Sequence, residues 1–281
     1  MEKEIELLNN KTFLDSDKKS NLQYMVDTSF KSNDIRGIYG IELNETLIYH
    51  IGVAVAEFLK PNIFIIGRDM RKSSLSLKNA FESGLRDKGV HCIDIGLCDT
   101  PMFYFVSLYL HLPGAMITAS HNPSEYNGIK LVKENAIPVG SLTGLTEIKQ
   151  LVLNHNKFQI KTIGSIIKKE FYNEYKIYID SIVQIPTSHK KIKVVVDAGS
   201  GMEGLLFPLI AEGLPITVVE KCFELDDNFP FHEANPLKSE NLILLKNSVI
   251  EEHADFGVAF DADGDRIIFV DENGENINPS I

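Results

Sequence analysis

The sequence predicts two consecutive α/β domains, each with a mixed, mainly parallel sheet covered by helices. Two series of short apolar runs alternate with stretches of helical period, one over residues 44–132 and one over residues 192–270. A polar region, residues 133–163, separates the two series. The chain has 281 residues, 44% of them hydrophobic, which is enough for two ordinary cores. Strands that alternate with helices are typical of parallel sheets.

The first series begins with a helix over residues 44–59, where apolar side chains recur at helical spacing until Pro61. Residues 62–67 (NIFIIG) then form a short buried strand. The remaining elements expected in this series are helices at 73–88 and 101–112 and strands at 90–96, 114–118 and 128–132.

The second series follows an amphipathic stretch, residues 170–185. Its expected strands are 192–197, 216–220, 256–260 and 267–270, with a glycine-rich turn and a helix after the first strand and a helix at 241–253. We therefore expect an N-terminal extension at 1–25, mobile or weakly helical, a first domain at 26–160 and a second at 161–275. Residues 276–281 read as the start of a further domain, with Ser280 as a helix cap.

Composition excludes several classes of partner. The formal net charge of −11 provides no uniform basic field for nucleic acid or an anionic membrane, and a small charged metabolite fits it better. The sequence contains no signal-peptide run and no stretch near the roughly 18 uncharged residues of a membrane span, so we expect a cytoplasmic protein. Cys92, Cys98 and Cys222 lack metal-ligand spacing and read as reduced core residues.

The segment GAMITASHNPSEYNGIK, residues 114–130, places Ser120 at the end of an apolar strand. Ligands of open α/β sheets bind beyond the carboxyl ends of strands, so a reactive hydroxyl is expected here. His121 and Lys130 are the nearby candidates for positioning and proton transfer. A plain turn is the alternative interpretation, whereas the lack of a Gly-x-Ser-x-Gly pattern argues against a serine hydrolase.

The segment DADGDR, residues 261–266, places three carboxylates at alternate positions in a tight turn. Such closely packed charges repel each other unless a cation lies among them, and Mg²⁺ prefers oxygen ligands of this kind. Arg266 is placed to face a phosphate. An EF-hand loop is disfavoured because Arg266 occupies the position that requires glycine and because strands flank the turn. An acidic solvated turn is the other alternative.

Five further segments have a structural and a functional interpretation. For the segment that contains Ser73 and Ser74 we prefer helix capping by either serine. The glycine-rich turn at 197–201 and the turn at 99–101 read as structural, and the role of 232–236 cannot be read from the sequence. Within the segment FKSNDIRG at 30–37, residues 34–37 (DIRG) would by themselves be a surface turn.

The string TASHNP followed by YNGIK, together with DADGDR, resembles the α-D-phosphohexomutases, the family of phosphoglucomutase and phosphomannomutase. The resemblance covers residues 30–279 and implies the two α/β domains of phosphohexomutase type. It implies that Ser120 is phosphorylated, that Lys130 is a general acid/base and that His121 supports the transferring phosphate. It also suggests that Arg36, within FKSNDIRG, reaches the active site. The phosphate-binding residues implied are Arg266 and Asn122, and the Mg²⁺ ligands implied are Ser120, Asp261, Asp263 and Asp265.

The activity implied is interconversion of hexose 1-phosphate and hexose 6-phosphate through a phosphoserine, with hexose 1,6-bisphosphate as intermediate and activator. The family's third and fourth domains have no counterpart in this sequence, so we expect an N-terminal fragment that is weak or inactive alone. A metal-dependent sugar-phosphate phosphatase and a non-catalytic phosphosugar-binding protein are the alternatives. The choice among glucose, mannose and glucosamine phosphates, and the oligomeric state, are left open.

Overall fold

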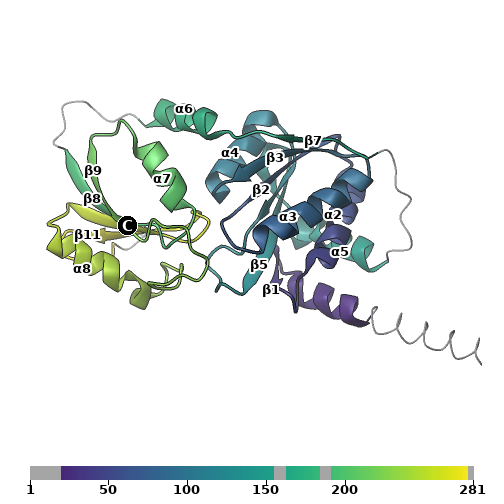
Figure 1. The fold of residues 1–281 in the computed structure, drawn as a ribbon, viewed down its shortest axis with the longest axis horizontal. Helices are drawn as coiled ribbons and strands as arrows, with labels where there is room; N and C mark the ends of the chain where they lie inside the picture. The colour runs from purple at the N-terminus through teal and green to yellow at the C-terminus, as the bar shows by residue number, and fades with distance from the viewer. Residues whose placement is uncertain (1–19, 155–162, 184–190, 278–281) are drawn as a thin grey trace, which may run out of the picture.

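The computed structural model describes residues 20–154, 163–183 and 191–277, which form two α/β units around separate sheets (Figure 1). The predicted fold class is confirmed. The first sheet contains β1 (Ile35–Ile38), β2 (Ile63–Arg68), β3 (His91–Leu97), β4 (Gly114–Ile117), β5 (Tyr126–Lys133), β6 (Ile137–Pro138) and β7 (Ile166–Lys168). The second contains β8 (Ile192–Asp197), β9 (Ile216–Lys221), β10 (Phe256–Phe260) and β11 (Ile267–Asp271).

The first sheet has the strand order β1-β5-β4-β2-β3-β7, with β6 paired to β5. Strands β4, β2, β3 and β7 are parallel, whereas β1 and β5 run antiparallel to their neighbours. The second sheet has the order β11-β10-β8-β9, in which β11 alone is antiparallel among the described strands. The carboxyl ends of β4 and β10 lead into the serine loop and the acidic loop of the predicted site.

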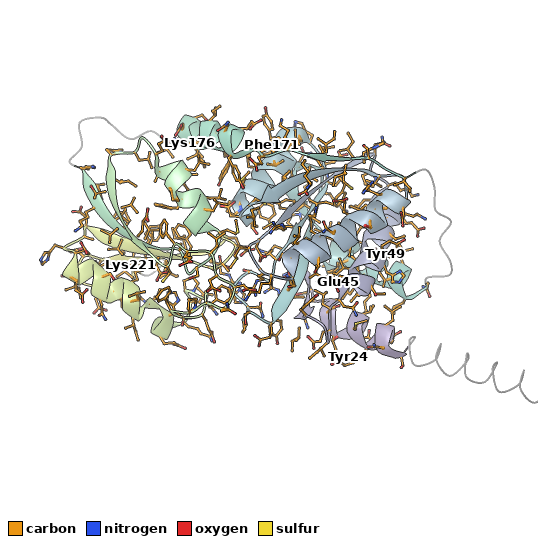
Figure 2. All side chains as sticks on the ribbon, in the orientation of Figure 1. Tyr24, Glu45, Tyr49, Phe171, Lys176 and Lys221 are labelled. Carbon is orange, nitrogen blue, oxygen red and sulfur yellow. The ribbon has the colours of Figure 1, made fainter. Side chains whose placement is uncertain are left out.

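Helices cover both faces of the first sheet. The helices α2 (Glu45–Leu59), α3 (Ser74–Asp87) and α5 (Thr146–Leu153) bury one apolar cluster against it. The helices α4 (Thr100–Leu110) and α6 (Tyr172–Ile182) bury a second cluster on the other side. Figure 2 shows side chains filling these layers, with Phe171, which is 1% exposed, under the start of α6. The second sheet packs against α7 (Glu203–Ala211) and α8 (Ile243–Glu251), and the short helices are η1 (Glu134–Ala136), η2 (Ser141–Leu145) and η3 (Ser239–Leu242).

Local sequence explains where the main helices begin and end. Asn44 caps α2 by accepting a hydrogen bond from Leu47 N at 2.9 Å, and Lys60 ends the helix in the left-handed conformation just before Pro61. Within the helix pair, a Cβ on Gly52 would lie 2.3 Å from Phe81 O, and one on Gly84 would lie 2.2 Å from Tyr49 O. These two glycines therefore allow α2 and α3 to pack at close range.

Several boundaries differ from the prediction. The strand β7 pairs with β3, so the first sheet extends beyond the boundary predicted at residue 160. The strand β7 has only three residues, so its apolar pattern is too short to be recognised in the sequence. The polar region 133–163 also contains α5, and FKSNDIRG contains β1 rather than a surface turn. Residues 20–29 are helical and bury Met25 and Val26, whereas residues 1–19 and the cap expected at Ser280 lie outside the described part.

Cys92 and Cys98 are buried and free, as predicted, and Cys222 is free but half-buried. Within the described residues, no helix combines the length and the apolar character needed to cross a membrane.

Candidate active site at the junction of the two domains

Ser120 lies just beyond β4 at the junction of the two domains. Its φ of 51° falls in the left-handed region, which is costly for a residue with a side chain. The side chain is 2% exposed, and Oγ donates a hydrogen bond to Asp261 Oδ2 at 2.7 Å. The hydroxyl of the first domain therefore contacts the acidic loop of the second.

A buried arginine holds the serine loop in this conformation. Arg71, 1% exposed, donates to the carbonyl oxygens of Ser120 at 2.8 Å, Asn122 at 2.6 Å, Pro123 at 2.7 Å and Tyr126 at 3.0 Å. No carbonyl by itself could offset the burial of a guanidinium, but four of them together with a carboxylate can. The carboxylate is Asp69, whose Oδ2 lies 3.3 Å from Arg71 Nε.

The capping role predicted for Ser73 or Ser74 is wrong. Ser73 stands at the N-cap of α3 without a side-chain cap bond, because its hydroxyl accepts from Asn127 Nδ2 at 2.7 Å. The hydroxyl of Ser74 donates to Asp69. The two serines therefore join the Asp69–Arg71 segment to strand β5, and the whole segment supports the serine loop.

The acidic loop presents three carboxylates toward one point. One oxygen each from Asp261, Asp263 and Asp265 lies within 4.8 Å of the other two. Asp261 and Asp263 are fully buried, and Asp263 Oδ1 has no hydrogen-bond partner among the described residues. Buried like charges and an orphaned acceptor fit a bound divalent cation, so the predicted ligand set could hold a metal ion.

Lys130 lies between two of these carboxylates. Its Nζ is 2.6 Å from Asp263 Oδ2 and 2.5 Å from Asp265 Oδ2. Burial disfavours the ammonium form, but the two aspartates outweigh burial and raise the pKa of Lys130 above its ordinary value. Burial by itself would raise the pKa of Asp263, but the positive charge of Lys130 outweighs burial and lowers that pKa. For Asp261, burial together with Asp263 and Asp265 raises the pKa to about 8.

Four further predicted residues surround this centre. The Nδ1 atom of His121 lies 3.4 Å from Ser120 Oγ, and burial, Arg266 and Arg36 lower the pKa of His121 to about 4. The Nε atom of Arg266 is 4.0 Å from Asp261 Oδ2. Arg36 pairs with Asp34 and donates to Asn122 Oδ1 at 2.5 Å, so Asn122 and Arg36 border the serine loop together.

Thr100 contributes to the site although the sequence interpretation treated its turn as structural. Its Oγ1 donates to Asp263 Oδ2 at 2.6 Å, and its backbone N–H donates to Asp263 O at 2.8 Å. The N-terminus of α4 therefore docks on the acidic loop. Asp99 caps the same helix by accepting from Met102 N at 2.7 Å, which agrees with a structural role for that residue.

The glycine-rich turn 197–201 packs directly against the acidic loop, in agreement with its predicted structural role. Gly201 approaches Ala262 so closely that a Cβ would lie 2.6 Å from the Ala262 carbonyl oxygen. Met202 N donates to the same carbonyl at 2.9 Å. Only glycine allows this approach of two backbones.

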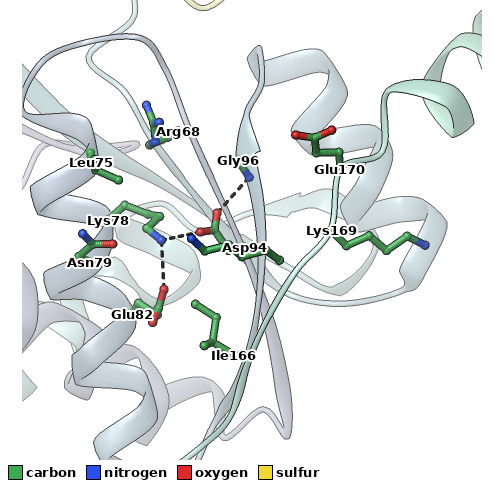
Figure 3. A pocket seen from close by; sticks show the side chains of 11 residues that line it. Arg68, Leu75, Lys78, Asn79, Glu82, Asp94, Gly96, Ile166, Lys169 and Glu170 are labelled. Carbon is green, nitrogen blue, oxygen red and sulfur yellow. Dashed lines mark hydrogen bonds and ion pairs between the residues drawn. The ribbon is translucent and has the colours of Figure 1, made fainter.

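A cavity of about 830 Å³ lies apart from this site, between α3 and strand β7 (Figure 3). Three of its charged groups pair with one another, since Lys78 Nζ lies 2.6 Å from Asp94 Oδ2 and 3.1 Å from Glu82 Oε2. None of the predicted site residues lines this cavity.

Comparison with known proteins agrees with this geometry. Residues 27–158 match the model of the phosphoglucomutase/phosphomannomutase α/β/α domain I, and residues 176–274 match the model of domain II. The chain belongs to this family. Within the α-D-phosphohexomutases it corresponds to the two N-terminal domains.

Curated relatives in the family include a phosphomannomutase of Vibrio cholerae, 37% identical over 261 residues, and phosphohexose mutases of Xanthomonas campestris, 41% identical over 250 residues. Each alignment covers 89% of this chain and 56% of the relative, so the chain spans about half the length of the curated relatives it matches. A solved phosphoglucomutase/phosphomannomutase family protein from Burkholderia thailandensis is 30% identical, with a TM-score of 0.82 over 89% of this chain and 56% of that one.

Proposed function

We propose that this chain carries the phosphoserine and metal-binding half of a phosphohexomutase, which interconverts hexose 1-phosphate and hexose 6-phosphate. The observation that carries the proposal is the contact between Ser120 Oγ and Asp261 Oδ2, made across the domain junction with Lys130 beside it. Family membership supports a sugar phosphate as substrate and a cytoplasmic location.

In the first transfer, the bond between Ser120 Oγ and phosphorus breaks while the free hydroxyl oxygen of the sugar bonds to phosphorus. The resulting hexose 1,6-bisphosphate then changes its orientation in the site, and its other phosphoryl group is transferred to Ser120. Such transfers need alignment and charge neutralisation more than covalent chemistry. The left-handed turn at Ser120 and the Arg71 contacts provide the alignment, since they fix the direction of Oγ.

Asp261, Asp263 and Asp265 would hold Mg²⁺, and an oxygen of phosphorylated Ser120 would complete the ligand set. The ion supplies charge neutralisation at the phosphoryl oxygens. Arg266 lies 4.0 Å from Asp261 Oδ2, and from there its guanidinium can bind phosphate through two hydrogen bonds. His121 is neutral at pH 7 in the unphosphorylated chain, so it can donate a hydrogen bond to phosphate without adding charge.

Lys130 would take the proton of the sugar hydroxyl, with Arg36 as a fixed positive charge beside the serine loop. In the metal-free chain Lys130 is held charged by Asp263 and Asp265, and in this state it is an acid rather than a base. Lys130 can accept a proton only when these carboxylates are neutralised by another cation. This requirement couples the proton transfer to a filled metal site.

The proposal predicts that Ser120 is the phosphorylated residue. The chain should acquire label from a phosphoryl-labelled hexose 1,6-bisphosphate, and mass spectrometry should locate it on Ser120. Ser120→Ala should abolish the labelling, whereas Ser124→Ala, which changes an exposed serine of the same loop, should retain it. Label that persists in the Ser120→Ala chain would overturn the assignment. Label that reaches Ser120 but passes only to water would favour a phosphatase instead.

A further inference from the structure

The second domain contains a group of metal-ligand side chains that the mutase chemistry does not use. Asp197 ends β8, Cys222 directly follows β9, and His232 lies in the irregular segment before η3. One carboxylate oxygen, the thiol sulfur and one ring nitrogen from these residues all lie within 4.8 Å of one another. Carboxylate, thiolate and imidazole are ligands of Zn²⁺ in proteins.

The surrounding backbone directs the ligand atoms toward one point. Gly199 N donates to Asp197 Oδ1 at 2.9 Å, which leaves Oδ2 facing His232 Nε2 at 2.9 Å. The other ring nitrogen, Nδ1, lies 3.0 Å from the carbonyl oxygen of Glu233. A carbonyl only accepts, so Nδ1 carries a proton and, in the neutral ring, Nε2 carries the lone pair. Metal-binding imidazoles are usually oriented by such a bond from the other nitrogen.

The space among the three ligand atoms requires positive charge. A lone pair on Nε2 would face Asp197 Oδ2 and, at 3.9 Å, Cys222 Sγ. In the metal-free chain a second ring proton, on Nε2, can be donated to Asp197 Oδ2 at 2.9 Å. A metal cation can replace that proton.

The separations are those of a tetrahedral site. Zinc bonds of about 2.0 to 2.1 Å to nitrogen and about 2.3 Å to sulfur place neighbouring ligand atoms roughly 3.3 to 3.6 Å apart. The observed separations of 2.9 Å and 3.9 Å lie on either side of this range, so small side-chain adjustments suffice. Cys222 is free and half-buried, and the side chain of His232 is 12% exposed, which provides a route for the ion.

We propose that Asp197, Cys222 and His232 bind one zinc ion, with water as the fourth ligand. The ion links the ends of β8 and β9 to the segment that carries His232. Ser200 N donates to Cys222 O at 2.8 Å, within the turn on which the acidic loop rests. Zinc therefore stabilises the base of the acidic loop and stays outside the phosphoryl chemistry.

Cobalt titration tests the site, because Co²⁺ bound to a thiolate absorbs in the near ultraviolet and Co²⁺ bound to carboxylates does not. The metal-free, reduced chain should develop this charge-transfer band at one cobalt per chain, and one equivalent of zinc should remove it. Asp263→Asn, which alters the acidic loop, and Cys92→Ala, which removes a buried thiol of the first domain, should both keep the band.

Cys222→Ser should lose the band while circular dichroism shows an intact fold, and His232→Asn should weaken cobalt binding by at least about 10-fold. A wild-type chain that shows no band at saturating cobalt overturns the proposal. Persistence of the band in the Cys222→Ser chain overturns it as well. Neither result bears on the phosphorylation of Ser120, so this proposal and the proposed function fail separately.

Discussion

Arg71 is a buried cation whose acceptors are mainly backbone carbonyls. Its guanidinium is planar and offers five donors in a fixed arrangement, so it can reach several carbonyls of one loop at once. Here it spans the loop from Ser120 to Tyr126. The conformation of Ser120 therefore depends on a side chain that touches none of the reacting atoms.

Replacement of Arg71 by Lys should slow phosphoryl transfer to Ser120 by about 100-fold, because a single ammonium cannot hold four carbonyls and a small displacement of Oγ is costly. Rapid-quench labelling with the bisphosphate measures the rate. Arg68→Lys, a change of the half-buried arginine at the end of β2, is the matched control and should label normally. Unchanged Mg²⁺ affinity in the Arg71→Lys chain would show that the second domain is intact. A normal labelling rate in Arg71→Lys would contradict the positioning role.

The raised pKa of His232 predicts that the stability of the metal-free chain depends on pH. This pKa is raised to about 10 in the folded state, against about 6.5 in the unfolded state. The stabilisation is therefore complete below about pH 6.5 and is lost as the pH rises through about 10. In the presence of a chelator, the thermal midpoint of the wild type should fall between pH 7 and pH 10 more steeply than that of His232→Asn. Parallel curves for the two chains would refute the assignment.

At the scale of the element, the acidic loop depends on one glycine. Gly264 has a φ of 71°, and a Cβ there would lie 2.3 Å from Glu203 Oε1. Glu203 has little room to move, since it is 3% exposed and hydrogen-bonded to Asp99. Burial raises the pKa of Asp99 to about 6 and that of Glu203 well above its ordinary range, so this carboxyl pair retains a proton beneath the loop.

Gly264→Ala should lower the Mg²⁺ affinity by at least about 10-fold, the equivalent of ~1.4 kcal/mol, because the loop must shift to relieve the contact. Gly213→Ala is the control: Gly213 has a φ of 83° but nothing within 4 Å of its Cβ position. Both variants place a side chain on a residue in the left-handed conformation, which costs about 1–2 kcal/mol. Only Gly264→Ala should also change metal binding. Calorimetry with Mg²⁺ compares them. Equal affinities in the two variants would show that the close contact at Gly264 does not shape the site.

At the scale of the whole molecule, the two domains are joined through their functional groups. Ser120, Thr100 and Lys130 of the first domain all contact Asp261 or Asp263 of the second. Each isolated domain would expose buried carboxylates or a strained serine loop. The candidate site is therefore part of the domain junction.

Because Lys130 pairs with Asp263 and Asp265, two of the proposed metal ligands, Lys130→Met should tighten Mg²⁺ binding by about 10-fold, or ~1.4 kcal/mol, while it removes the proposed acid/base. Lys133→Met, on the same strand, should leave the affinity unchanged. Calorimetry measures both. Weaker Mg²⁺ binding in Lys130→Met would show that the lysine supports the metal site instead of occupying it.

Most strands and helices could be predicted because their signals are local. Apolar runs such as 192–197 and 256–260 follow from a few neighbouring residues, and the structure confirms them. The exceptions include the helix α5 and two short edge strands. Strands β1 and β7 contain four and three residues and depend on a partner strand far along the chain.

The sequence alone determined which residues are candidates for the chemistry, since Ser120 and the three aspartates follow strands within short, recognisable strings. The tertiary structure alone decided how they meet: Arg71 beneath the serine loop, Thr100 on Asp263, and Lys130 between Asp263 and Asp265. Local residue patterns encode strands, turns and caps, because those interactions join near neighbours. Contacts between residues more than a hundred positions apart, such as those of Thr100 and Lys130 with Asp263, arise only when the two domains pack, and no local pattern specifies them.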